Sequence, residues 1–193
     1  MKTANDRQAR RTGLLAIGMI AILSCSVTAQ TGPLSDAHKT LVARLDAMKA
    51  DLFEMSDWMY RNPEYGYQEV KTIEKMLAPL RQAGFTARVG IAGFPTAVRA
   101  EKRFGTGRPT LAFVPMPDGL RGPDNTAFHG CHHNLQNAAA VGAALVLTKY
   151  MEEHSLNGTV AVITYTAEEI PPPTINDMNA AGGIGLRHGD LHV

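Results

Sequence analysis

Beyond residue 34, apolar residues first recur at helical spacing. They stand three or four positions apart in two successive runs: Leu41, Leu45, Met48, Leu52, Met55 and Met59, then Val70, Ile73, Leu77 and Leu80. Such spacing places each run along one face of a helix. We expect the first helix to begin after Ser35, a residue suited to an N-cap, and to end at Asn62-Pro63. The second helix is expected to open at Gln68 or Glu69 and to end at Gly84.

The pattern then changes to short apolar stretches, which predict strands at residues 86–89, 96–100, 110–114 and 159–165. The continuous apolar run at 111–114 is typical of a strand buried on both faces, and the polar run at 101–109 indicates a solvated hairpin. Residues 138–147 are small or apolar and predict a buried helix, and Thr174 can cap a further short helix. Helices alternating with buried strands predict an α/β fold with an open sheet.

Residues that can bind a metal follow the third predicted strand. Residues 129–134 are His-Gly-Cys-His-His-Asn, directly before the apolar helix. Thiolate and imidazole are ligands of zinc and similar transition metals, and the spacing of Cys131 and His133 lets both turn toward one ion. An ordinary polar loop is the alternative.

Two glutamates, Glu168 and Glu169, follow the last predicted strand. One could bind a metal while its neighbour takes a proton from a metal-bound water. A solvated strand end is the alternative. Since both clusters lie just beyond buried strands, they are expected to meet at one edge of the sheet.

The N-terminal residues and the charge limit the cellular setting. A basic start, a short apolar run at 13–23 and the small residues Val27-Thr28-Ala29 predict a secretory signal peptide over residues 1–29, hence a periplasmic or secreted protein. A retained membrane anchor and lipoprotein processing at Cys25 are alternatives. Without Cys25, the thiol of Cys131 is the only one left, and it is either held by a metal or buried and inert. The formal net charge of +1 gives no electrostatic case for a nucleic-acid partner.

Four segments, in order, resemble the metal-dependent aminoacylase, carboxypeptidase and amidohydrolase family of peptidases. They are Tyr-Arg-Asn-Pro-Glu-Tyr-Gly at 60–66 followed by Glu69, Gly-Phe-Pro-Thr-Ala at 93–97, the cluster at 129–134, and Thr-Ala-Glu-Glu at 166–169. The resemblance is strongest to the amidohydrolase branch, which includes aminobenzoyl-glutamate hydrolase and auxin-conjugate hydrolases. It covers roughly residues 34–182.

The resemblance implies a role for each matching residue. Cys131, His133 and Glu169 match metal ligands, Glu168 matches the general base, and Asp118 matches an aspartate that orients the site, with a turn aspartate as its alternative. The implied cofactor is a divalent metal, two ions per site, zinc, manganese or cobalt. The implied reaction is hydrolysis of the amide bond of an N-acyl or N-aroyl amino acid or small peptide, by a metal-bound water activated by Glu168. A homodimer of the full-length protein is also implied.

The chain departs from the family pattern in three respects. His132 replaces a glycine, Met116 and Pro117 replace more polar residues, and the 193 residues end before the family's lid and dimerisation domain. The expected fold is therefore a partial zinc-peptidase-like catalytic domain over residues 30–193, with a mixed sheet flanked by helices. His192 is a candidate for a further ligand, His188 a weaker one, and His129 is assigned to loop structure.

A truncated, catalytically inactive remnant or a non-enzymatic binding protein of the same fold is the alternative function. A frameshift after about residue 182 would produce such a chain.

Overall fold

The computed structural model describes residues 35–169. The predicted signal peptide, the cleavage alternative at Cys25, the short helix after Thr174 and the candidate ligands His188 and His192 lie outside these residues and stay predictions.

Three long helices account for the helical periodicity. They are α1 (Asp36–Arg61), α2 (Val70–Gln82) and α3 (His133–Glu153). The Ser35 side chain caps α1 by accepting a hydrogen bond from the backbone nitrogen of His38 at 3.3 Å. Val70 lies in the first turn of α2 and is 60% exposed, so its predicted inward orientation is wrong. Among residues 35–169, no helix combines the length and apolarity needed to cross a membrane.

Four strands form the main sheet, in the order β1, β2, β6, β3. These strands are β1 (Thr86–Val89), β2 (Val98–Phe104), β3 (Thr110–Phe113) and β6 (Gly158–Ile163). β6 runs parallel to β3 and antiparallel to β2. A short 3-10 helix, η1 (Ile91–Gly93), and a two-stranded ribbon of β4 (Leu120–Arg121) and β5 (Ala127–Phe128) complete the described elements.

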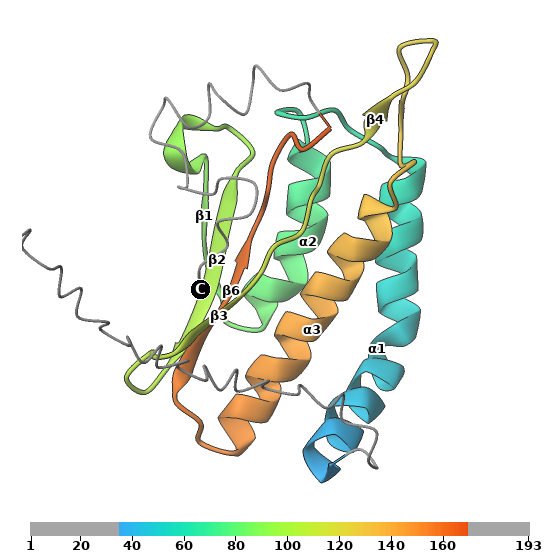
Figure 1. The fold of residues 1–193 in the computed structure, drawn as a ribbon. Helices are drawn as coiled ribbons and strands as arrows, with labels where there is room; N and C mark the ends of the chain where they lie inside the picture. Colours follow the sequence, from blue (N-terminus) through green and yellow to red (C-terminus); the bar gives the residue numbers. More distant parts are fainter. Residues whose placement is uncertain (1–34, 170–193) are drawn as a thin grey trace, which may run out of the picture. The chain divides into compact units, whose positions relative to one another are not determined.

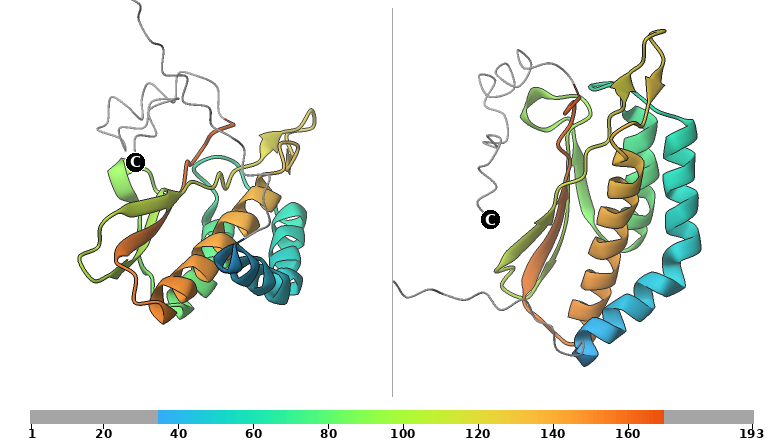
Figure 2. Two further views of the ribbon diagram at one scale, coloured as in Figure 1. Left: turned by 60° about the horizontal axis from the view of Figure 1, so that its bottom comes forward. Right: turned by 45° about the vertical axis from the view of Figure 1, so that its right-hand side comes forward.

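All three helices lie on one side of the main sheet, as Figures 1 and 2 show from three directions. The core forms between them, where side chains from α1, α2 and α3 pack against the apolar face of β2 and β6. Its most buried members include Met59, Met76, Leu80, Val141, Val98, Val160 and Val162. The predicted mixed sheet flanked by helices is therefore present in the described part of the chain.

The tertiary structure corrects two predictions for the strands. β2 continues to Phe104, and it does not form a hairpin with β3, because β6 lies between the two strands. β3 is an edge strand of the described sheet, and Leu111 is 47% exposed. The prediction that this strand is buried on both faces is therefore wrong for the described residues, because their helices cover only one face of the sheet.

Candidate metal centre

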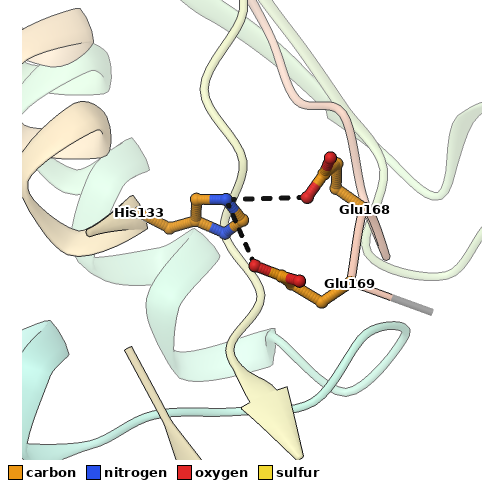
Figure 3. A group of neighbouring side chains, drawn as sticks. All are labelled: His133, Glu168 and Glu169. Carbon is orange, nitrogen blue, oxygen red and sulfur yellow. Dashed lines mark ion pairs between the residues drawn. The ribbon is translucent and has the colours of Figure 1, made fainter. Parts of the chain in front are cut away.

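Three side chains that could hold a metal ion meet beyond the ends of β3 and β6. His133, Glu168 and Glu169 each offer a ligand atom, and these atoms lie within 4.8 Å of one another. His133 Nε2 is 3.7 Å from Glu168 Oε2 and 3.7 Å from Glu169 Oε1, and both carboxylates point toward the imidazole (Figure 3). His133 from the first predicted cluster and both glutamates of the second therefore lie together at one edge of the sheet, as expected.

Parallel strand pairing explains why residues far apart in the sequence converge here. Because β3 and β6 are parallel, the segments that follow them leave the sheet at the same edge. The backbone nitrogen of Tyr165 donates to the carbonyl oxygen of Pro115 at 2.9 Å, which joins the two segments. The backbone nitrogen of Glu169 donates to Asp118 Oδ2 at 2.8 Å. The loop after β3 therefore fixes the turn that carries the glutamates.

Asp118 is hydrogen-bonded to the His133 ring and to the turn that carries the glutamates. It is fully buried, and its backbone carbonyl accepts a hydrogen bond from His133 Nδ1 at 2.8 Å. A proton on Nδ1 leaves the Nε2 lone pair facing the two glutamates. Burial acts to lower the pKa of His133, but the hydrogen bonds and charge of Asp118, with the charge of Glu169, outweigh it and raise that pKa. This position fits the orienting role predicted for Asp118.

The donor set fits a divalent cation. Imidazole nitrogen and carboxylate oxygen are ligands that zinc, manganese and cobalt all accept. Asp118 Oδ1 and Glu169 Oε1 are buried and accept no hydrogen bond of ordinary geometry from residues 35–169, with His133 Nδ1 lying 3.5 Å from the first and His133 Nε2 3.7 Å from the second. Buried carboxylate oxygens that lack donors are stabilised by a nearby positive charge. The residues present could therefore hold a metal at His133 Nε2.

Cys131, predicted as a ligand, lies beside this group but outside it. Its side chain is exposed. A hydrogen bond to the Glu169 carboxylate, followed by partial desolvation and by the charges of Glu169, Glu168 and Asp118, raises the pKa of the thiol to about 11. The thiol therefore stays protonated in the absence of a cation. A bound metal would lower the pKa of the Cys131 thiol, because coordination to a cation deprotonates a thiol.

His132 adopts the backbone conformation for which glycine is favoured. Its φ and ψ are 64° and 26°, in the left-handed region, and it is the N-cap of α3. Its carbonyl oxygen accepts hydrogen bonds from the backbone nitrogens of Leu135 at 3.0 Å and Gln136 at 3.2 Å. The side chain is exposed, with Nδ1 lying 3.1 Å from the carbonyl oxygen of Gly130. The histidine therefore adds backbone strain without pointing its ring into the metal group.

His129, assigned to loop structure from the sequence, is buried next to the candidate centre. Neither ring nitrogen has a hydrogen-bond partner within the described residues. Burial, and then the charge of His133, lower the pKa of His129 and outweigh the opposing effects of the Asp118 charge and the nearby Met59 backbone. The ring is therefore held in the neutral form, and its assignment to loop structure stays a prediction.

A further buried carboxylate, Glu69, contacts the turn that carries the glutamates, and the sequence pattern gave it no role in the site. Its side chain is fully buried, Oε2 accepts a hydrogen bond from Thr96 Oγ1 at 2.5 Å, and Oε1 accepts one from the backbone nitrogen of Ala167 at 3.2 Å. Glu69 and Thr96 both belong to the segments that resemble the peptidase family, and this was the one sign in the sequence of a contribution to the site. Burial could not be inferred from the sequence, because glutamate is almost never fully buried unless it is paired.

Glu69 should make the stability of the protein depend on pH. Burial, opposed mainly by the hydrogen bond from Thr96, raises the pKa of Glu69 from 4.5 to about 7. The folded state therefore holds this proton more tightly than the unfolded state. Stability should fall as pH rises from about 4.5 to 7, by up to about 3 kcal/mol for this group.

The effect can be isolated by comparing two proteins. We expect the free energy of unfolding of E69Q, measured by urea denaturation at several pH values, to lack this part of the pH dependence. The difference between the wild-type and E69Q curves removes the contribution of all other titrating groups. Parallel curves between pH 4.5 and 7 would contradict the prediction.

Known proteins are similar to this chain over part of its length. No family model matches the chain. Over 140 residues it is 31% identical to one of the subunits of the p-aminobenzoyl-glutamate hydrolase of Escherichia coli, a match that covers 64% of this chain and 29% of that protein. Over 162 residues it is 27% identical to the IAA-amino acid hydrolase ILR1-like 5 of Arabidopsis thaliana, a match that covers 76% of this chain and 35% of that protein.

A solved structure supports the same relationship. A dinuclear metal-binding peptidase of the M20 family from Bacillus subtilis matches with a TM-score of 0.58 and 26% sequence identity, over 71% of this chain and 40% of that one. The chain spans about a third of the length of the curated relatives it matches, which fits the predicted N-terminal part of such a protein. By sequence and by fold, this chain is a relative of the metal-dependent M20 peptidases and amidohydrolases.

Proposed function

We propose that this chain forms part of a metal-dependent hydrolase that cleaves the amide bond of an N-acyl or N-aroyl amino acid or a small peptide. The observation that carries the proposal is the meeting of His133, Glu168 and Glu169 at the carboxyl ends of β3 and β6. Ligand sites in open α/β sheets commonly lie at that edge. The names of both curated relatives describe hydrolases of amino acid conjugates, which supports the substrate class.

Different residues of this chain would bind the metal, orient its ligands and transfer the proton. His133 Nε2 and a Glu169 oxygen would hold the metal, joined by Cys131 once its thiol is deprotonated. A divalent metal, when bound, supplies Lewis acidity that makes water a better nucleophile and polarises the scissile carbonyl. Asp118 keeps both ligands in place, through its carbonyl oxygen on His133 Nδ1 and its carboxylate on the Glu169 backbone nitrogen.

Glu168 would move the proton. Its carboxylate is the more exposed of the two, at 28% against 13% for Glu169, so it can reach a water and a substrate. One carboxylate oxygen takes a proton from the water as the new carbon–oxygen bond forms. The same group then donates that proton to the leaving nitrogen as the carbon–nitrogen bond breaks. Atoms and charge balance without a further reactant.

A pocket of about 400 Å³ borders the candidate centre and could receive the substrate. Glu169 forms part of its wall, together with Tyr65, Gly66, Gln68, Gly119, Leu120 and Arg121. The guanidinium of Arg121 lies 4.7 Å from the centre of the Tyr65 ring and donates a hydrogen bond to Asn125 Oδ1 at 3.0 Å. The Arg121 guanidinium could therefore bind the carboxylate of a substrate. Every N-acyl amino acid has such a carboxylate.

Other parts of the proposal rest on the family resemblance. Two metal ions per site, drawn from zinc, manganese or cobalt, are proposed because the matching Bacillus subtilis peptidase is dinuclear. A homodimer of the full-length protein is likewise proposed from the resemblance, and export to the periplasm or the medium is proposed from the N-terminal sequence.

Removal of the metal tests the function. The protein is expressed from its complete reading frame, and release of the free amino acid from p-aminobenzoyl-glutamate and N-acetyl amino acids is followed. We expect about two metal ions per chain, loss of hydrolysis after chelation, and recovery when zinc, manganese or cobalt is restored. A protein that purifies without metal and shows no turnover after metal addition would support the inactive remnant or binding protein instead.

A further inference from the structure

The mechanism above leaves the buried carboxylate of Glu69 without a role. Burying a carboxylate is unfavourable unless hydrogen bonds or charges compensate for the lost water. Glu69 has two such bonds, from the Thr96 hydroxyl and from the backbone nitrogen of Ala167, and both partners are buried too. The second bond joins the start of α2 to the turn that carries the metal-site glutamates.

The backbone at Ala167 is the reason this bond matters. Ala167 has a φ of 62°, in the left-handed region that residues with a side chain rarely adopt. Such a conformation persists only where the surrounding structure enforces it. Ala167 directly precedes Glu168 and Glu169, so its backbone angles decide where both carboxylates point. The turn is therefore fixed at two places, by Glu69 at residue 167 and by Asp118 at residue 169.

Residues 64–69, which include Glu69, also contact the loop that carries Asp118. The carbonyl oxygen of Glu64 accepts a hydrogen bond from the backbone nitrogen of Gly119 at 2.8 Å, next to Asp118. The Glu64 carboxylate accepts hydrogen bonds from the backbone nitrogen and hydroxyl of Thr72 at 2.8 Å and 2.9 Å, which anchors it to the first turn of α2. Residues 64–69 thus bind both loops whose relative position sets the distance from His133 to the glutamates.

We propose that Glu69 is a positioning residue of the metal site, whose carboxylate holds Ala167 in the left-handed conformation and so aims Glu168 and Glu169 at His133. This inference rests on the proposed function, because it assigns Glu69 to the centre that would bind the metal. The hydrogen bond itself can be tested without a metal.

Three substitutions at one position separate positioning from general stability. E69Q keeps a side-chain oxygen that can accept from Ala167, and E69D keeps the charge but is shorter by one methylene. E69A removes the acceptor. T148V is the matched control, since it removes a buried threonine hydrogen bond, to the carbonyl oxygen of Ala144, about four helical turns along α3 from His133.

Cobalt(II) binding and its absorption spectrum report on the ligand geometry. We expect E69A and E69D to bind cobalt about 10–100-fold more weakly than wild type, the usual cost of losing an outer contact of a metal site. Their spectra should change, E69Q should recover most of the affinity, and T148V should match the wild type. Unchanged affinity and spectrum in a folded E69A or E69D would overturn the inference, and E69D serves if E69A does not fold.

Hydrogen exchange at the Ala167 amide distinguishes failure of the inference from failure of the proposed function. If the wild type binds no cobalt, the proposed function fails, but the Ala167 amide of the metal-free protein should still exchange more slowly than in E69D. Equal exchange in the two proteins would show that Glu69 does not hold the turn, whatever the metal result.

Discussion

Replacing Glu168 with glutamine is expected to lower kcat by about 10²–10⁴-fold, the usual contribution of a general base. Glutamine has nearly the same size and keeps an oxygen near His133 Nε2, which in the wild type lies 3.7 Å from Glu168 Oε2. It cannot take a proton from water. The loss should therefore fall on kcat, with metal content and KM for the acyl amino acid little changed.

Two further variants sharpen the test. E169Q should lose metal affinity as well as activity, because Glu169 is assigned as a ligand and its backbone is fixed by Asp118. E54Q, which changes an exposed glutamate paired with Lys75 on the helical layer, should leave both properties unchanged. Steady-state kinetics with metal analysis of each protein measures the difference. A Glu168→Gln protein that kept more than about a tenth of the wild-type kcat would rule out Glu168 as the base.

Replacing His133 with alanine is expected to weaken metal binding by at least about 100-fold, the upper end of what loss of an outer contact alone costs. The imidazole is buried and held by the Asp118 carbonyl, so Nε2 is aimed before any metal arrives. Without the imidazole, the group keeps only the carboxylates of Glu168 and Glu169 and loses its nitrogen ligand. Isothermal titration with zinc or cobalt measures the affinity.

His154 offers the control for that measurement. It is an exposed histidine at the other end of the same helix, the C-cap of α3, and its Nδ1 lies 2.9 Å from the carbonyl oxygen of Tyr150. H154A should therefore leave metal affinity at the wild-type value. Equal affinities for H133A, H154A and wild type would place any metal site elsewhere in the protein.

The spacing of apolar residues along the sequence was sufficient to predict the helices. The three-and-four spacing that ends in Met55 and Met59 predicted α1, and both methionines are buried in the core. The run at 138–147 lies inside α3, although the periodicity did not show that this helix begins at His133. These features depend on neighbours within one or two turns, which is the range over which sequence periodicity carries information.

The strand order could not be predicted in the same way. Sequential strands often pair, so a hairpin between β2 and β3 was the natural expectation. The structure instead inserts β6, which is separated from β3 by the whole of α3. Pairing of this kind depends on contacts between distant segments and on the crossover helix that connects parallel strands.

The sequence by itself identified residues whose chemistry suits metal binding and proton transfer, Cys131, His133, Glu168 and Glu169, and the family resemblance added Asp118 as an orienting residue. Only the tertiary structure decided how they are held. It brings Glu168 and Glu169 to His133, leaves Cys131 at the exposed rim, and buries Glu69 against Ala167. The physical reason is that side-chain chemistry is a property of each residue, whereas distance and burial are set by parallel pairing of β3 with β6 and by packing of the helices on one face of the sheet.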